Sequence, residues 1–195
     1  VMDSISRVRV VDSPHLVSVP GTSPQKPSVP ESFEAKWQSI VDLTARIIDV
    51  PASLIMRLKE SSIEVFVSSD TPGNPYKTGS GEALGIGLYC ETVMGKRAAL
   101  LIPDALNDES WRQNPDVELG MISYLGVPIL WPDGEVFGTF CVLDKEENHY
   151  SRDTQQLLER LAELVENDLK SLADTAAQVD RAELRALELR HRIKN

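Results

Sequence analysis

The most regular hydrophobic pattern in the chain is a seven-residue repeat over residues 151–195. One apolar row is Leu158, Val165, Leu172, Val179, Ala186 and Ile193, and the row between is Leu161, Thr175, Ala182 and Leu189. A heptad repeat of this length is typical of a helix that packs against another helix in a coiled coil. We therefore expect a dimer seam made by Leu158, Leu161, Val165, Leu172, Val179 and Leu189.

A helix of this length would be about 65 Å long at 1.5 Å per residue, so its far end should leave the globular part of the protein. The polar residues Asp168 and Thr175 lie on the seam and would weaken the coil in its middle. Because the chain stops inside this helix without a capping residue, we expect a fragment of a longer protein.

The preceding residues alternate between helical and strand-like patterns. Apolar residues recur every three or four positions over 32–49, which predicts an amphipathic helix. Strand patterns cover 52–60, 63–69, 98–102, 122–131 and 135–143, and Asp133-Gly134 between the last two is a strong hairpin signal. Short helices are expected at 87–94 and within 105–119, and 70–87 is expected to be a long loop.

This order predicts an α+β fold, with an antiparallel sheet of five or six strands flanked by helices and a long C-terminal coiled-coil helix. Three segments follow: a Pro/Ser-rich arm or linker at 1–31, a globular domain at 32–150, and an output helix at 151–195. The prolines of the arm exclude a helix there, although residues 7–10 alternate and could add a short strand.

Composition narrows the possible partners and the compartment. The net charge of −10 makes nucleic acid an unexpected partner, since phosphate binding needs a clustered positive field. No apolar run is long enough to span a membrane and no signal peptide is recognisable, so we expect a cytoplasmic protein. The two cysteines, Cys90 and Cys141, form no disulfide framework and no metal-ligand spacing, and no metal site is expected.

Several motifs occur in a familiar order: Gly85-Ile86-Gly87-Leu88-Tyr89-Cys90-Glu91-Thr92-Val93, Leu101-Ile102-Pro103-Asp104-Ala105, Trp111-Arg112-Gln113-Asn114-Pro115-Asp116, Ser123-Tyr124-Leu125-Gly126-Val127-Pro128-Ile129 and Phe137-Gly138-Thr139-Phe140-Cys141-Val142-Leu143-Asp144. Over about residues 32–172 they resemble the GAF domains of bacterial sensor histidine kinases and diguanylate cyclases. The resemblance implies the fold and a sensory role. It leaves the ligand open, because such domains bind nucleotides, tetrapyrroles, haem and small metabolites, or only each other.

The end of the chain has a resemblance of its own. Leu189-Arg190-His191-Arg192-Ile193-Lys194-Asn195 resembles the start of a histidine kinase phosphoacceptor box. The resemblance implies that His191 receives phosphate from ATP and passes it to an aspartate of a response regulator, in a homodimeric kinase. ATP would bind in a part of the intact protein that this chain lacks, so the fragment itself is not expected to be an enzyme. The heptad places His191 on the outward face of the helix, beside the cations of Arg190 and Arg192.

By the resemblance to GAF domains, a small molecule would lie between one face of the sheet and the loops and small helices over it. Candidate contacts are Tyr89, Cys90, Glu91, Trp111, Asn114, Met121 and Tyr124, which combine aromatic walls with polar groups. Packing of a ligand-free dimerisation module is an equal alternative for these residues. Cys90 could also serve redox chemistry of the type found in GAF-fold reductases of free methionine sulfoxide, while Cys141 fits a buried strand. A haem ligand is not expected from His15, His149 or His191.

Overall fold

The computed structural model describes residue 19 and residues 26–194. Its elements are α1 (Glu31–Ile48), β1 (Ala52–Leu58), β2 (Ser62–Ser68), β3 (Gly81–Ala83), α2 (Tyr89–Lys96), β4 (Leu100–Ile102), the 3₁₀ helix η1 (Ala105–Asn107), α3 (Pro115–Glu118), β5 (Ser123–Leu130), β6 (Val136–Asp144) and α4 (Arg152–Lys194). Six strands form one sheet in the order β3-β2-β1-β6-β5-β4, and every neighbouring pair is antiparallel. The expected α+β class, with an antiparallel sheet flanked by helices and a long C-terminal helix, is confirmed.

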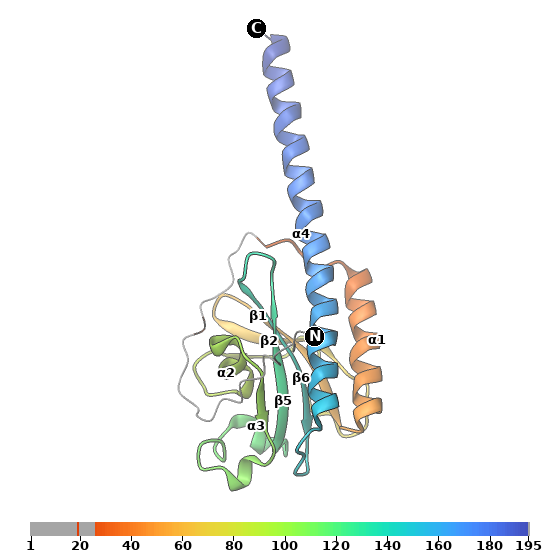
Figure 1. The fold of residues 1–195 in the computed structure, drawn as a ribbon. Coiled ribbons are helices and arrows are strands. Elements are labelled where there is room, and N and C mark those ends of the chain that lie inside the picture. The colour runs from red at the N-terminus through yellow and green to blue at the C-terminus, as the bar shows by residue number, and fades with distance from the viewer. Residues whose placement is uncertain (1–18, 20–25, 195) are drawn as a thin grey trace, which may run out of the picture.

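The sheet separates two hydrophobic cores. Along β6, Phe140 and Val142 point to the core under α1 and α4, whereas Cys141 and Leu143 point to the core under α2 and α3. This alternation is the two-residue period of a strand that is buried on both faces. Figure 1 shows α1 and α4 side by side against one face, with α2 and α3 over the other.

The edge strand β3 lies inside the segment expected to be a loop. Its residues are all exposed, and it pairs with β2 through Ser62, Ile63 and Glu64. A strand of three exposed residues carries no apolar alternation, so its sequence holds no strand signal. The strand nevertheless matters for the site, because it forms one edge of the cavity described below.

Helix α4 has a buried first half and an exposed second half. Leu158, Val165 and Leu169 are completely buried in the core beneath α1 and α4, after which the helix projects far beyond the sheet (Figure 1). The heptad stripe therefore changes role along the helix, from packing inside its own domain to exposure.

The residues of the predicted dimer seam differ in their exposure along α4. The side chains of Leu158 and Val165 are occupied by their own domain, and Leu161 and Leu172 are partly buried against the same core. Further along, Val179 is 51% exposed and Leu189 59% exposed. The exposed part of the predicted seam therefore lies beyond Leu172.

Asp168, a polar residue of the predicted seam, connects α4 to α1. Its carboxylate accepts a hydrogen bond from Trp37 Nε1 at 2.9 Å and bonds from Lys36 Nζ at 2.8 and 2.9 Å. Trp37 has no exposed surface. The carboxylate of Asp168 therefore gives a partner to a buried indole N–H, which would otherwise cost free energy.

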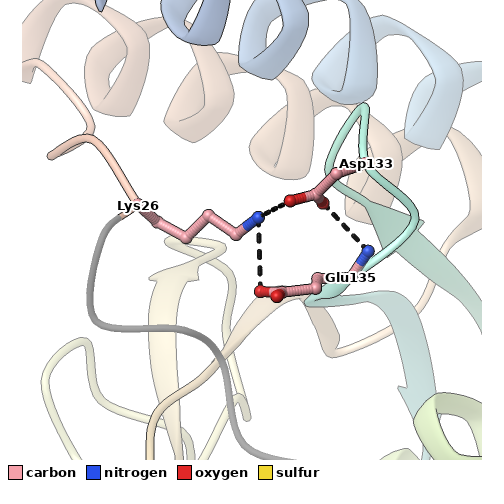
Figure 2. Close-up of polar contacts among 3 residues, drawn as sticks. All are labelled: Lys26, Asp133 and Glu135. Atoms are coloured by element: carbon pink, nitrogen blue, oxygen red, sulfur yellow. Dashed lines mark hydrogen bonds and ion pairs between the residues drawn. The ribbon is translucent and has the colours of Figure 1, made fainter.

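The described end of the N-terminal arm is fixed to the turn between β5 and β6. Lys26 forms ion pairs with Asp133 and Glu135, as Figure 2 shows, and its ammonium group lies 5.5 Å from the centre of the Trp131 ring. Burial lowers the pKa of Lys26, but its bonds to both carboxylates outweigh this effect and raise the pKa overall.

The expected strand at residues 7–10 lies outside the described residues. Among the described residues, no helix is long and apolar enough to cross a membrane.

Candidate functional site

A cavity of about 440 Å³ lies on the α2 and α3 side of the sheet. Its lining comes from β1, β2, β3, β5, β6, α2, α3 and the loops that follow β2 and β3: Leu54, Met56, Ile63, Val65, Pro75, Tyr76, Ser80, Gly81, Glu82, Ile86, Leu88, Cys90, Pro115, Asp116, Glu118, Leu119, Tyr124, Cys141 and Leu143. Sites for small molecules have this size and this mixture of apolar walls with a few polar groups.

Asp116 is the buried acidic group of the cavity. Only 9% of the residue is exposed, and its Oδ1 accepts a hydrogen bond of 2.7 Å from the hydroxyl of Tyr76. Burial raises the pKa of Asp116 to about 6, although the Tyr76 bond lowers it. A carboxyl group in this position can change its charge near neutral pH.

The start of α3 holds Asp116 in place. Asn114 caps this helix: its Oδ1 accepts from the backbone N–H of Asp116 at 2.9 Å, and its side-chain N–H donates to the Gly87 carbonyl at 2.8 Å. Pro115 follows at the first helical position, where a missing N–H costs nothing. The Asn114 side chain thus ties α3 to the loop before α2.

The thiols of Cys90 and Cys141 are neighbours in the lining of the cavity. Thr139 donates to Cys90 Sγ at 3.4 Å, and the Tyr124 hydroxyl lies 3.4 Å from the same sulfur. The neighbouring thiol of Cys141 is the main cause of a lowered pKa at Cys90, while burial raises the pKa of Cys141. Cys90 is therefore the thiol of this pair that ionises first.

The candidate residues from the sequence separate into distinct groups in the structure. Cys90 and Tyr124 line the cavity. Tyr89, Trp111 and Met121 are at most 1% exposed and pack in the core around it, with ring centres 5.3 Å apart for Tyr89–Trp111 and 4.8 Å for Tyr89–Tyr124. They shape the wall from behind, which corresponds to the packing alternative for these side chains.

Glu91 and Asn114 organise loops. The carboxylate of Glu91 accepts hydrogen bonds from the backbone N–H groups of Gly85, Ile86, Gly87 and Leu88, at 2.7 to 3.2 Å. With Glu91 only 5% exposed, these bonds occupy its acceptor oxygens. Neither Glu91 nor Asn114 is among the lining residues.

Sequence reasoning did not identify Tyr76, Glu82 or Asp116 as site residues. The Asn114-Pro115 pair is a recognisable helix start and could have placed Asp116 in the first turn of α3. Nothing comparable marks Tyr76, because it lies in a loop and meets Asp116 from 40 positions away.

His191 lies in the last turn of α4, the helix whose C-terminal part projects beyond the sheet (Figure 1). Its side chain is exposed, as are those of Arg190 and Arg192. The side chain of Lys194 and all of Asn195, the last residues of the phosphoacceptor-like motif, lie outside the described residues.

The sequence model of the GAF domain matches residues 32–169. Among solved structures, the blue-light absorbing form of the PixJ GAF domain of Thermosynechococcus elongatus aligns with a TM-score of 0.66 and 13% identity, over 77% of this chain and 92% of that one. The type II free methionine-R-sulfoxide reductase of Thermoplasma acidophilum aligns with a TM-score of 0.58 and 13% identity, over 73% and 95%. The GAF domain region of a putative membrane protein of Geobacter sulfurreducens PCA aligns with a TM-score of 0.59 and 15% identity, over 72% of this chain and 94% of that one.

At these identities the structural similarities show the fold alone. No sequence match to a curated protein is found.

Proposed function

Since this chain belongs to the GAF domain family, we propose that it is the sensory module of a two-component histidine kinase, in which a small molecule in the cavity controls α4 and, through it, His191. The observation that carries this proposal is the continuity of α4. One uninterrupted helix, Arg152–Lys194, begins in the domain core and extends to His191.

Strand β5 provides a physical connection between the cavity and α4. Tyr124 near its start lines the cavity, and the backbone N–H of Leu130 at its end donates to Glu166 Oε1 of α4 at 2.8 Å. A ligand that shifts Tyr124 would thus act on a strand bonded directly to the output helix. Two packings of α4 that differ in ligand affinity are sufficient for a switch.

A second copy of the chain is the proposed partner of the projecting helix. Val179, Leu189 and Ile193 are 51%, 59% and 84% exposed and follow the heptad row. Pairing with the same row in a parallel homodimer would remove this apolar surface from water, at about 25 cal/mol per Å². On α1, next to α4, Leu43 and Ile47 are also exposed and would extend the contact.

The proposed chemistry at the end of the helix is phosphoryl transfer to His191. An exposed imidazole can be approached by a separate ATP-binding domain, and Arg190 and Arg192 would offset the charge of the phosphoryl group. The phosphohistidine would then donate its phosphoryl group to an aspartate of a response regulator. Transfer to the imidazole breaks the bond between the γ-phosphorus of ATP and its bridging oxygen, and releases ADP.

The test is phosphorylation of the whole gene product with γ-labelled ATP. We expect label that is lost in acid and retained in alkali, absent from His191→Gln and present in the control His149→Gln, whose histidine is also exposed. Label that survives the His191→Gln substitution, or the absence of any label in the wild type, would refute the phosphoacceptor role.

A second candidate function, thiol redox chemistry, is favoured by the contact between Cys90 and Cys141 in the cavity. Two thiols could reduce a sulfoxide to the sulfide and water while forming one disulfide, so that atoms and electrons balance. Incubation with free methionine sulfoxide should then consume two thiols per sulfoxide reduced, and Cys90→Ser should abolish the reaction. If no thiol is lost, this candidate is eliminated.

A further inference from the structure

The charged side chains that line the cavity are all acidic. Its ionisable carboxyl groups are Glu82, Asp116 and Glu118, and the described residues that line it include no lysine, arginine or histidine. Glu82 and Glu118 are exposed, while Asp116 is buried. An anionic ligand such as a nucleotide or a carboxylic acid would meet a negative field without a compensating cation.

The hydrogen bonding of Asp116, which lines the cavity, is incomplete. Tyr76 occupies Oδ1, and within the described part of the chain no group bonds Oδ2. A buried carboxylate with an open acceptor is costly unless a donor or a cation pairs with it. A ligand that presents a positively charged N–H group would fill this acceptor and neutralise the charge in one contact.

The apolar lining residues of the cavity determine the chemical character of the remaining part of the ligand. Leu54, Met56, Ile63, Val65 and Leu143 form an apolar floor on β1, β2 and β6. Burial of hydrocarbon against such side chains is favourable, and these side chains offer no hydrogen bonds. The ligand therefore needs an apolar body that fits within about 440 Å³.

We propose that the cavity binds an organic cation, in which an amine or amidine group pairs with Asp116 and an apolar body lies on the floor of β1, β2 and β6. This inference rests on the proposed function of the cavity as a small-molecule site, and it specifies the chemical class. The Tyr76 hydroxyl holds the carboxylate in position, and Glu82 and Glu118 attract the cation at the edge of the cavity.

Three isosteric probes test the class: benzamidine, which is cationic, benzamide, which is neutral, and benzoate, which is anionic. Each is titrated into the full chain and followed by protein NMR. Compounds this small bind with Kd values on the order of 1 mM. We expect benzamidine to bind at least about tenfold more tightly than benzamide, because a charge-assisted bond is worth that factor or more. Benzoate should not bind.

Variants then assign the contact to Asp116. Asp116→Asn should remove the preference for benzamidine over benzamide, while the control Glu109→Gln, an exposed acid that does not line the cavity, should leave it unchanged. A normal circular dichroism spectrum checks that the Asn variant folds. Because the cavity tolerates a protonated Asp116 near neutral pH, the neutral amide is a mild substitution.

The pH dependence of the wild type gives a second readout that needs no variant. Below about pH 6, where Asp116 gains a proton, benzamidine affinity should fall by up to about tenfold per pH unit. Tyr76, Tyr124 and Cys141 also face the cavity, and burial raises the pKa of each, so they stay neutral in this range. The remaining acidic groups there are Glu82, Glu118 and Cys90, and loss of the slope in Asp116→Asn would exclude them as its source.

Different results would refute the proposal that the cavity binds a small molecule and the proposal that this molecule is a cation. If benzamide or benzoate binds as well as benzamidine, or if Asp116→Asn keeps the preference, the cavity is a ligand site but the cation assignment is refuted. If none of the probes shifts any cavity resonance, both proposals for the cavity fail, and a ligand-free dimerisation module becomes the function.

Discussion

Replacing Asp168 by alanine tests whether this carboxylate couples α1 to α4. The substitution leaves the indole N–H of Trp37, which has no exposed surface, without its partner at 2.9 Å. A buried hydrogen bond to a charged group is worth about 1.5–3 kcal/mol. The ion pair with Lys36, whose side chain is 51% exposed, adds at most about 1 kcal/mol. We therefore expect Asp168→Ala to lower the free energy of unfolding by about 2 kcal/mol.

The assay is urea unfolding followed by tryptophan fluorescence and by circular dichroism. Asp168→Asn keeps an acceptor for Trp37 and should lose less than about 1 kcal/mol, and Asp174→Ala, at an exposed position of the same helix, should be nearly neutral. The dependence of the unfolding free energy on urea should stay the same, because no large surface changes. A loss below about 0.5 kcal/mol for Asp168→Ala would show that the contact does not hold the helices together.

Three further outcomes follow from the site. Glu91→Ala should lower the free energy of unfolding by at least about 2 kcal/mol, because the N–H groups of residues 85–88 lose a shared acceptor. Hydrogen exchange of these amides should become faster, and unchanged exchange would contradict this. The folded pKa of Asp116, about 6, lies above its ordinary 3.8, so stability should fall by at most about 3 kcal/mol as pH rises from about 4 to about 6; urea titrations should show a flatter profile for Asp116→Asn. In Gly126→Ala the added methyl group would overlap the hydroxyl of Tyr124, so the free energy of unfolding should fall by about 1–3 kcal/mol, measured by thermal unfolding. An unchanged stability would mean that the Tyr124 ring has room to move.

The parts of the fold predicted from the sequence are those with long periodic patterns. The heptads of α4, the stripe of α1 and the Asp133-Gly134 hairpin each repeat a local signal, so their elements appear within a few residues of the predicted bounds. Strand β3 is the counterexample. It exists because Gly81–Ala83 lie beside β2, and that pairing leaves no trace in so short a segment.

The site was harder to predict, because its residues meet through tertiary contacts. Tyr76 and Asp116 come together across a loop and α3, and no spacing rule connects them. Glu91 has the residue type of a ligand contact, but the conformation of residues 85–88 turns their N–H groups onto its carboxylate. The seam of α4 shows the same limit: the heptad alone cannot tell that Leu158 and Val165 pack inside their own domain.

Cross-linking through α4 tests the central claim, that this helix pairs with a second copy and controls His191. Val179→Cys places a thiol on the exposed seam, and Leu184→Cys places one on another face of the same helix, where Leu184 is 62% exposed. In a parallel dimer of the whole gene product, Val179→Cys should form an interchain disulfide rapidly under mild oxidation and change the phosphorylation of His191. Leu184→Cys should do neither. Equal cross-linking at both positions, or a Val179→Cys disulfide that leaves phosphorylation unchanged, would contradict the account.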